Sequence, residues 1–245
     1  MLVTIVVPTY KEKENLKPLV ERVFKALRAA KINDKDAELI VVDDNSKDGS
    51  VEVIEALAKR GYNARIIVRT KERGLSSAVL RGFDEGIGSN AQYLICMDAD
   101  LQHPPESVPQ LVAALRGGAP FVIGTRYAAG TAVDKDWPLH RRIISGGARM
   151  LARPLSALSD PMSGFFGLDA KLYQRAGASI NPIGYKIALE CFVKSGSKSF
   201  EEVPINFGVR TAGESKLDGK VIVSYLIHLW ELYCYKYPFF PFLLL

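Results

Sequence analysis

Short continuous runs of apolar residues alternate with amphipathic stretches over the first half of the chain. The clearest amphipathic stretch, 16–30, repeats apolar residues every three or four positions, as a helix with one buried face does. The apolar runs do not alternate with polar residues, which is typical of strands buried on both faces. The pattern predicts strands at 3–7, 38–42, 64–68, 93–97 and 121–123 and helices at 16–30, 50–60, 76–87 and 105–116. This order indicates an α/β fold with a mostly parallel sheet flanked by helices.

Beyond Tyr127, apolar runs and amphipathic stretches no longer alternate regularly. It predicts a loop at 128–138, a helix at 139–151, and strands at 165–168 and 203–207 with helical stretches between them. The second half therefore extends the same fold with less regular connections.

Residues 221–245 form an apolar segment after a catalytic domain that we expect to occupy 1–220. A helical stripe comprises Val221, Ile222, Tyr225, Leu226, Leu229, Leu232 and Tyr233. The aromatic tail at 237–245 is too short to span a bilayer, which takes roughly 20 apolar residues. We expect an amphipathic helix and tail that lie in a membrane interface, with an ordinary core helix and a loose tail as the alternative.

Composition and charge narrow the choice of partner and compartment. The 245 residues are 48% hydrophobic and 24% charged, which is ordinary for a globular protein and argues against disorder. A net charge of +5 indicates an anionic partner, but no basic cluster is dense enough to favour nucleic acid. The 3 cysteines are far apart among apolar residues, which argues against disulfides and zinc sites. With no basic leader and no Asn-x-Ser/Thr sequon, we expect a reducing, cytosol-facing location.

The strongest chemical signal is the junction where the apolar run at 93–97 meets Asp-Ala-Asp-Leu-Gln-His. Alternate residues of an extended backbone face the same side, so we expect Asp98, Asp100 and Gln102 to project together from the end of the strand. Their oxygen atoms suit Mg²⁺ or Mn²⁺, which keep open positions for phosphate groups. The junction therefore predicts a cation site that holds a diphosphate, and an acidic turn is the plainer alternative. Polar residues at 8–12 and 43–46 also follow strands, so they fall at the same edge of the sheet.

Seven segments resemble glycosyltransferase family 2, in particular its single-chain fungal and protist members that use a polyprenyl phosphate as acceptor. They are Val-Pro-Thr-Tyr-Lys-Glu (7–12), Val-Asp-Asp-Asn-Ser-Lys-Asp-Gly-Ser (42–50), Arg-Thr-Lys-Glu-Arg-Gly-Leu-Ser-Ser-Ala (69–78), Met-Asp-Ala-Asp-Leu-Gln-His-Pro-Pro (97–105), Gly-Thr-Arg-Tyr (124–127), Asp-Pro-Met-Ser-Gly-Phe-Phe (160–166) and Gly-Glu-Ser-Lys-Leu (213–217). The resemblance implies a GT-A fold, GDP-mannose as donor, dolichyl phosphate as acceptor and a divalent cation. It also implies a place on the cytosolic face of the endoplasmic reticulum membrane, where the product supplies mannose for protein glycosylation and GPI-anchor synthesis. A longer hydrophobic anchor follows in the single-chain type, and the present sequence departs from it there: either this chain lies in the membrane interface or the sequence stops inside its anchor.

The resemblance also implies a donor pocket, in which carboxylates accept hydrogen bonds from guanine and Asp100 is the most important metal ligand. The implied donor residues are Pro8, Tyr10, Glu12, Val42, Asp44, Asp98, Ala99, Asp100 and Gln102. For Tyr10 and Glu12 the alternative is a strand-to-helix turn with a capping acid. Asp43 is better explained as a buried capping carboxylate.

On the acceptor side, arginine suits a phosphate because its planar fork can donate two parallel hydrogen bonds. The resemblance assigns Arg126, Arg141 and Ser145 to the acceptor phosphate. It assigns Arg210, Lys216 and Lys186 to the diphosphate or to both phosphates. Arginines on the 139–151 helix could instead only solvate an exposed face, which we expect for Arg142 and Arg149. The segment at 213–219 is either a surface loop or, by resemblance, a lid.

The expected reaction needs no protein base. A phosphate monoester has a second pKa of about 6, so the acceptor is largely a dianion near neutral pH and can attack the anomeric carbon itself. One displacement would invert the α-linked donor to a β-linked product. We assign no histidine to catalysis, although His103 adjoins residues 98–102, which carry the predicted metal ligands and are called the metal segment below. The alternatives are a UDP-glucose-dependent polyprenyl-phosphate glucosyltransferase and a non-catalytic subunit of a membrane complex.

Overall fold

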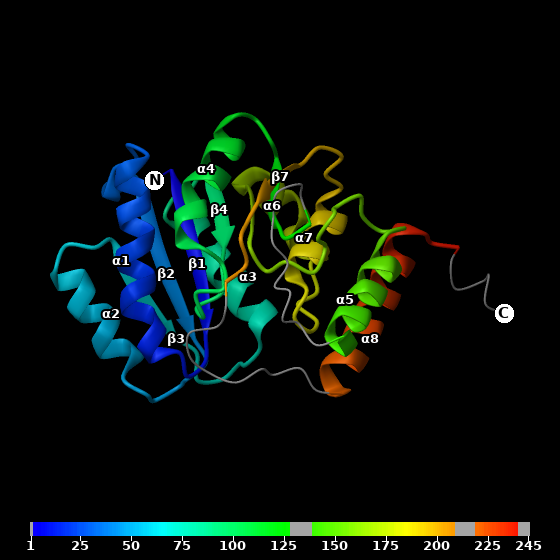
Figure 1. The fold of residues 1–245 in the computed structure, drawn as a ribbon, viewed down its shortest axis with the longest axis horizontal. Coiled ribbons are helices and arrows are strands. Elements are labelled where there is room, and N and C mark those ends of the chain that lie inside the picture. The colour runs from blue at the N-terminus through cyan, green and yellow to red at the C-terminus, as the bar shows by residue number, and fades with distance from the viewer. Residues whose placement is uncertain (1, 128–138, 209–218, 240–245) are drawn as a thin grey trace.

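The computed structural model describes residues 2–127, 139–208 and 219–239, apart from the side chains of 139–145 and 220. Within these ranges a seven-stranded sheet has the order β3-β2-β1-β4-β6-β5-β7 (Figure 1). The strands are β1 (Val3–Thr9), β2 (Ala37–Asp43), β3 (Ala64–Val68), β4 (Tyr93–Cys96), β5 (Phe121–Thr125), β6 (Phe166–Asp169) and β7 (Glu201–Pro204). Neighbouring strands are parallel except for β6, which is antiparallel to β4 and β5. The predicted α/β fold with a mostly parallel sheet is confirmed.

Helices cover both faces of this sheet. They are α1 (Lys13–Ala29), α2 (Ser50–Lys59), α3 (Leu75–Gly88), α4 (Val108–Arg116), α5 (Leu139–Ala152), α6 (Ala170–Ala176), α7 (Ile187–Ser195) and α8 (Gly219–Lys236). Short 3₁₀ turns lie at Asp34–Asp36, Pro105–Ser107 and Gly177–Ser179. The helix predicted at 105–116 is thus a 3₁₀ turn followed by α4.

Strand β1 shows why the apolar runs are continuous. All seven of its residues are buried. Val3, Ile5 and Val7 join a core cluster with α1, α2 and α4, whereas Val6 joins a second cluster with α3, α6 and α7. Side chains alternate between the two faces of a strand, so a sheet covered on both faces needs apolar residues at successive positions.

The last strand lies earlier than predicted. The prediction of 203–207 is wrong because β7 is an edge strand that pairs with β5 alone, so its first residues can be polar. Glu201 and Glu202 lie opposite Val122 and Ile123 of β5, and only Val203 of the strand is buried.

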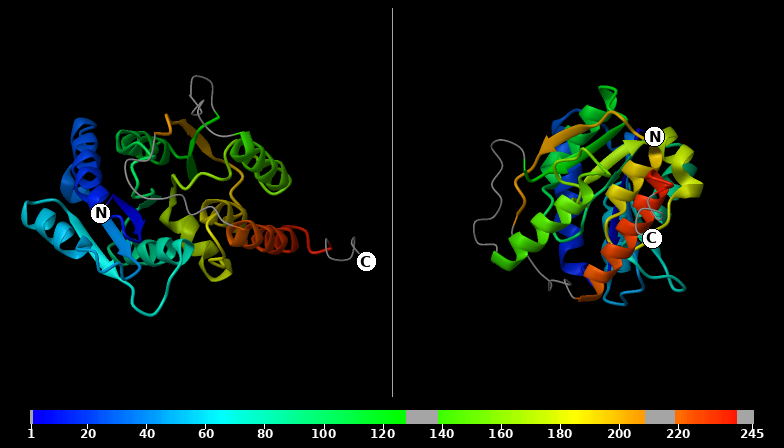
Figure 2. Two further views of the ribbon diagram at one scale, coloured as in Figure 1. Left: turned by 60° about the horizontal axis from the view of Figure 1, so that its bottom comes forward. Right: turned by 90° about the vertical axis from the view of Figure 1, so that its right-hand side faces the viewer.

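Helix α8 packs beside α5, at the end of the molecule away from α1 and α2 (Figure 2). It buries Leu229 and Leu232, but Ile222 and Leu226, predicted to share their stripe, are 41% and 50% exposed. The predicted stripe is therefore part buried and part exposed, because α8 meets its neighbours on one side only. No helix in the described ranges is long and apolar enough to cross a membrane.

Candidate active site

A cavity of about 450 Å³ lies at the carboxyl ends of β1, β2, β3 and β4, the edge of the sheet that the sequence indicated. Its size is in the range of small-molecule sites. It is lined by Pro8, Thr9, Tyr10, Glu12, Asp44, Arg73, Gly74, Leu75, Ala78, Asp98, Ala99, Asp100 and Tyr185. The structure therefore brings together seven residues of the predicted donor pocket, drawn from three separate segments.

Two predicted donor residues do not line this cavity. Val42 is fully buried in the core cluster on the α3 side of the sheet. Gln102 pairs with the segment after β7, because its side-chain Nε2 donates to the Gly208 carbonyl at 3.2 Å and its own carbonyl accepts from the Gly208 N–H at 2.9 Å. The role of Gln102 as a metal ligand stays a prediction.

The backbone at 98–102 differs from the extended segment that we predicted. Strand β4 ends at Cys96, and a turn follows in which Leu101 has a φ of +63°. The Asp100 carboxylate accepts the N–H of Gln102 at 3.1 Å and so stabilises this turn. Asp98 and Asp100 reach the same cavity through the turn rather than through alternation along a strand. A left-handed leucine costs about 1–2 kcal/mol, and such strain is typical of functional sites.

His103 packs against the metal segment and holds its backbone in place. Its Nδ1 accepts the backbone N–H of Asp98 at 3.0 Å, and its ring stacks on Phe165 with 5.3 Å between centroids. The ring is 2% exposed, and burial lowers the pKa of His103. Gly164 fits tightly here, since a Cβ would lie 3.3 Å from both carboxylate oxygens of Asp98. These contacts give His103 a structural role, and the expectation that it takes no part in catalysis stays a prediction.

The carboxylates in this cavity fit a divalent cation. Asp98 and Asp100 line the same space, and Asp98 forms no ion pair with an arginine or lysine of the described residues. Two carboxylates that share a site repel each other unless a cation lies between them, and hard oxygen ligands suit Mg²⁺ or Mn²⁺. In the described part of the chain no three Asp, Glu, His or Cys residues gather to hold a metal alone. The remaining ligands would be water, substrate phosphate or the Gln102 amide.

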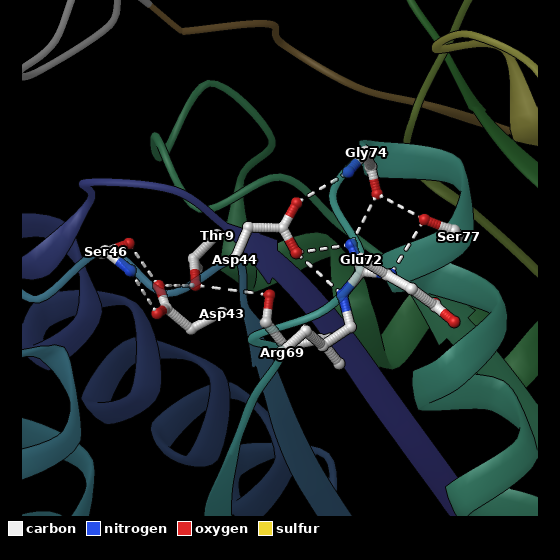
Figure 3. A network of polar contacts seen from close by, with 9 residues as sticks. Thr9, Asp43, Asp44, Ser46, Arg69, Glu72, Gly74 and Ser77 are labelled. Atoms are coloured by element: carbon white, nitrogen blue, oxygen red, sulfur yellow. Dashed lines mark hydrogen bonds and ion pairs between the residues drawn. The ribbon is translucent and has the colours of Figure 1, made fainter.

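Asp44 is fixed on the cavity wall by a clamp that the sequence reading missed (Figure 3). Arg69 donates to one oxygen of Asp44 from Nε at 2.7 Å and also from Nη2, and the N–H of Gly74 donates to the other oxygen at 2.8 Å. Arg69 also donates to the Gly74 carbonyl at 2.8 Å and to Ser77 Oγ at 2.8 Å. The signal that could have found Arg69 was its place at the start of the family-like segment 69–78, directly after β3.

Two other acidic residues near Asp44 have different roles: Asp43 is structural, and Glu12 belongs to the cavity. Asp43 is 2% exposed and accepts from the Ser46 N–H at 2.8 Å and from Thr9 Oγ1 at 3.2 Å, so its predicted role as a buried cap is confirmed. Glu12 precedes α1, but its side chain does not cap that helix. It accepts from Asn15 Nδ2 at 2.8 Å and lines the cavity, so the capping alternative for Glu12 is wrong.

Two partly buried cations lie close to the metal segment. Arg126 donates to Asp160 from Nε at 2.7 Å and from Nη2 at 2.8 Å, and Asp160 is fully buried. Burial alone would lower the pKa of Arg126, but Asp160 raises it above its usual value. Lys186 donates to the Met162 carbonyl at 3.1 Å, and burial together with Arg126 lowers the pKa of Lys186. Asp160 therefore occupies the edge of the Arg126 guanidinium formed by Nε and Nη2.

Several predicted residues lie outside the described part of the molecule. Arg141, Arg142 and Ser145 are on α5, but their side chains are not described, nor is that of His140. Arg210, Lys216 and most of the predicted lid at 213–219 also fall outside it. Arg149, expected only to solvate α5, instead places its guanidinium 3.8 Å from the ring centre of Tyr127. That expectation is wrong, because the guanidinium stacks on an aromatic ring.

Known proteins resemble this chain in sequence and in fold. The glycosyl transferase family 2 model matches residues 4–177. The dolichol-phosphate mannosyltransferase of Mycosarcoma maydis is 57% identical over 241 residues, which are 97% of this chain and 81% of that protein. The protein of the same name from Saccharomyces cerevisiae is 57% identical over 240 residues, which are 96% of this chain and 88% of that protein.

Among solved structures, glucosyl-3-phosphoglycerate synthase from Mycobacterium tuberculosis, in complex with Mn²⁺, UDP-glucose and glycerol 3-phosphate, matches with a TM-score of 0.64. The identity is 20%, and the match covers 94% of this chain and 80% of that chain. The resemblance drawn from the sequence motifs is confirmed by these matches. The chain therefore belongs to glycosyl transferase family 2 and is a glycosyltransferase with the GT-A fold.

Proposed function

We propose that this glycosyltransferase moves mannose from GDP-mannose to dolichyl phosphate, with a divalent cation and with inversion at the anomeric carbon. The observation that carries the proposal is the single cavity that gathers Glu12, Asp44, Asp98 and Asp100 at the carboxyl edge of the sheet. The names of the two fungal relatives support mannose as the sugar and dolichyl phosphate as the acceptor.

On the donor side, the fixed carboxylate of Asp44 is suited to accept hydrogen bonds from the N1 and N2 donors of guanine. The clamp of Arg69 and Gly74 holds that carboxylate before the donor arrives, so little ordering remains for the binding step. Asp98 and Asp100, and by prediction Gln102, would hold Mg²⁺ or Mn²⁺ against the diphosphate. The cation would supply stabilisation of the negative charge that the leaving nucleoside diphosphate gains.

On the acceptor side, a negatively charged oxygen of the phosphate would act as the nucleophile. Arg126 and Lys186 provide positive charge next to the metal segment, and we propose that Arg141, Ser145, Arg210 and Lys216 complete this side. A fixed cationic surface would orient the phosphate oxygen toward the anomeric carbon, opposite the leaving group. The product would be dolichyl β-mannosyl phosphate.

The acceptor is a lipid, so we also propose that the protein works at the cytosolic face of the endoplasmic reticulum membrane. Large apolar residues of α5, α8 and the segment that follows are exposed. They are Met150, Leu151, Ile222, Val223, Leu226, Ile227, Trp230, Tyr235, Tyr237 and Phe239. Exposed apolar residues of this kind, several of them aromatic, suit a lipid interface. Residues 1–220 would then supply the chemistry and 221–245 the membrane contact.

The proposal is tested by incubating the protein with dolichyl phosphate, Mn²⁺ and labelled GDP-mannose or labelled UDP-glucose, and counting the label that enters the lipid extract. We expect label from GDP-mannose, in a β-linkage, and none for Asp100→Asn. Label from UDP-glucose alone would favour the glucosyltransferase alternative. Absence of label from both donors would favour a non-catalytic role.

A further inference from the structure

Helix α8 holds α5 and α7 together without joining either core cluster of the sheet. A third apolar cluster consists of Ala152, Leu155, Met162, Leu189, Val193, Leu229 and Leu232. Leu229 and Leu232 come from α8, and Figure 1 shows α5 and α8 side by side. Neither sheet cluster contains a described residue of α5. The described half of α5 therefore has its apolar packing in this third cluster, to which α7 and α8 both contribute.

The carboxyl end of α5 is bound to α8 by hydrogen bonds from side chains. The last carbonyls of a helix have no partner within the helix. In α5, the carbonyls of Arg149, Met150 and Ala152 accept N–H groups of the chain that follows. The carbonyl of Leu151 accepts instead from the Tyr233 hydroxyl at 2.7 Å.

The carbonyls just after α5 are bound in the same way. Lys236 donates to the carbonyls of Pro154 at 3.0 Å and Leu155 at 2.8 Å, and the Tyr237 hydroxyl donates to Pro154 at 2.7 Å. A lysine ammonium here also interacts favourably with the negative end of the α5 dipole. Tyr233 and Lys236 of α8 and the following Tyr237 thus fasten the end of α5. One turn earlier in α5, the Ala148 carbonyl accepts from the Tyr225 hydroxyl of α8 at 2.8 Å.

Helix α8 is also connected to α7, through a buried hydrogen bond between His228 and Glu190. His228 Nε2 lies 2.7 Å from Glu190 Oε2, and Lys194 donates to Glu190 Oε1 at 2.6 Å. The three side chains are at most 6% exposed. Burial would raise the pKa of Glu190, but the hydrogen bonds from His228 and Lys194 lower it below its usual value. Helix α7 packs on the sheet, and the contact between His228 and Glu190 connects α8 to α7. Helix α8 is therefore held in place and can in turn position α5.

We infer that Tyr233, Lys236 and Tyr237 are positioning residues for acceptor binding, because they set the direction in which α5 presents its amino-terminal half to the acceptor phosphate. The inference rests on the proposed function, which places Arg141 and Ser145 of α5 at that phosphate. Ten residues of helix span about 15 Å, so a tilt of about 10° at the fastened end moves Arg141 by about 2–3 Å. A displacement of even 1 Å can cost about 10²-fold in a well-ordered site.

The inference is tested with the triple variant Tyr233→Phe/Lys236→Met/Tyr237→Phe, which removes the hydrogen bonds and keeps the rings and the aliphatic chain. The matched control is Tyr235→Phe, whose hydroxyl donates to Lys194 of α7 at 3.5 Å and not to α5. Three quantities are measured: the KM for a short-chain, detergent-soluble polyprenyl phosphate, the GDP affinity by calorimetry, and amide hydrogen exchange over 146–152. The short acceptor keeps membrane binding out of the comparison.

We expect the triple variant to raise the acceptor KM by about tenfold or more and to speed exchange over 146–152 by a similar factor. We expect its GDP affinity to stay within about twofold of wild type, and the control to match wild type throughout. An unchanged acceptor KM in an active enzyme would overturn the inference, and so would an equal loss of GDP affinity, which indicates general disruption. If wild type transfers no mannose, the proposed function fails together with the acceptor role, while the exchange rates still decide whether these side chains fasten α5.

Discussion

The substitution Arg69→Met should weaken GDP binding, although Arg69 itself is not expected to touch the nucleotide. Arg69 does not line the cavity, but it holds one oxygen of Asp44, which does. Methionine keeps part of the length and apolar character of the side chain, and it removes the guanidinium. The Asp44 carboxylate is then left with the Gly74 N–H as its remaining partner from the clamp.

The structure allows the size of both effects to be worked out. The side chains of Arg69 and Asp44 are 5% and 10% exposed, and removal of one member of a buried ion pair costs about 3–5 kcal/mol of folding stability. We expect the lower end of that range, because Asp44 borders a cavity that water can enter. If Asp44 then fails to meet guanine, a hydrogen bond to a charged group worth about 1.5–3 kcal/mol is lost. That corresponds to roughly a tenfold to hundredfold weaker GDP affinity.

Calorimetric titration with GDP measures the affinity, and urea unfolding measures the stability. Ser77→Ala is the matched control, since it removes a different partner of Arg69 and leaves the Asp44 contacts in place. A double-mutant cycle with Asp44→Asn shows whether Arg69 acts through Asp44, in which case the double variant binds GDP no worse than Asp44→Asn alone. A folded Arg69→Met protein with wild-type GDP affinity would refute the reasoning.

Four further predictions concern the metal, the acceptor, the membrane and the base. Asp100→Asn, which keeps a side-chain oxygen for the Gln102 N–H, should abolish transfer with little change in the thermal unfolding midpoint, and activity in excess chelator would contradict the metal site. Arg141→Ala and Ser145→Ala should each weaken use of dolichyl phosphate about tenfold or more in initial-rate assays, while calorimetry shows unchanged GDP affinity. Deletion of 238–245, which keeps Tyr237, should release the protein from lipid vesicles in a sedimentation assay while transfer to a soluble acceptor persists; equal sedimentation with and without these residues would count against it. His103→Gln should slow steady-state transfer far less than the ~10²–10⁴-fold expected for loss of a general base.

The sheet and the edge that carries the site could be predicted because local patterns report them. The buried strands appear as apolar runs, and the polar groups that end β1, β2 and β4 meet at one edge because parallel strands place their carboxyl ends together. The first residues of β7 were missed because an edge strand can be polar. The two faces of α8 could not be told apart, since a helix with apolar residues on both sides does not show which side meets α5 and α7.

The charge pairs could not be predicted from local patterns. Arg69 and Asp44 are 25 positions apart, and Arg126 and Asp160 are 34 apart. Nothing local in the sequence distinguishes an arginine that holds a buried carboxylate from one that solvates a surface. The turn at Leu101 was missed for a similar reason, because leucine rarely adopts a positive φ and carries no turn signal. The family resemblance located these segments, but only the fold shows which side chains hold one another.

The arrangement of protons and charges favours a nucleophile that arrives already ionised. To act as a general base, His103 would need a ring-nitrogen lone pair that faces the substrate, but its Nδ1 already accepts the N–H of Asp98. A neutral imidazole with an accepting Nδ1 carries its proton on Nε2, so neither nitrogen of His103 can take a proton from the acceptor. The groups beside the metal segment are instead cations, Arg126 and Lys186, and they would attract an anionic acceptor. A phosphate monoester meets both conditions, because it is largely a dianion near neutral pH and its oxygen attacks without losing a proton. An alcohol acceptor would have to lose a proton that His103 cannot take, so the state of this histidine supports the proposed phosphate acceptor.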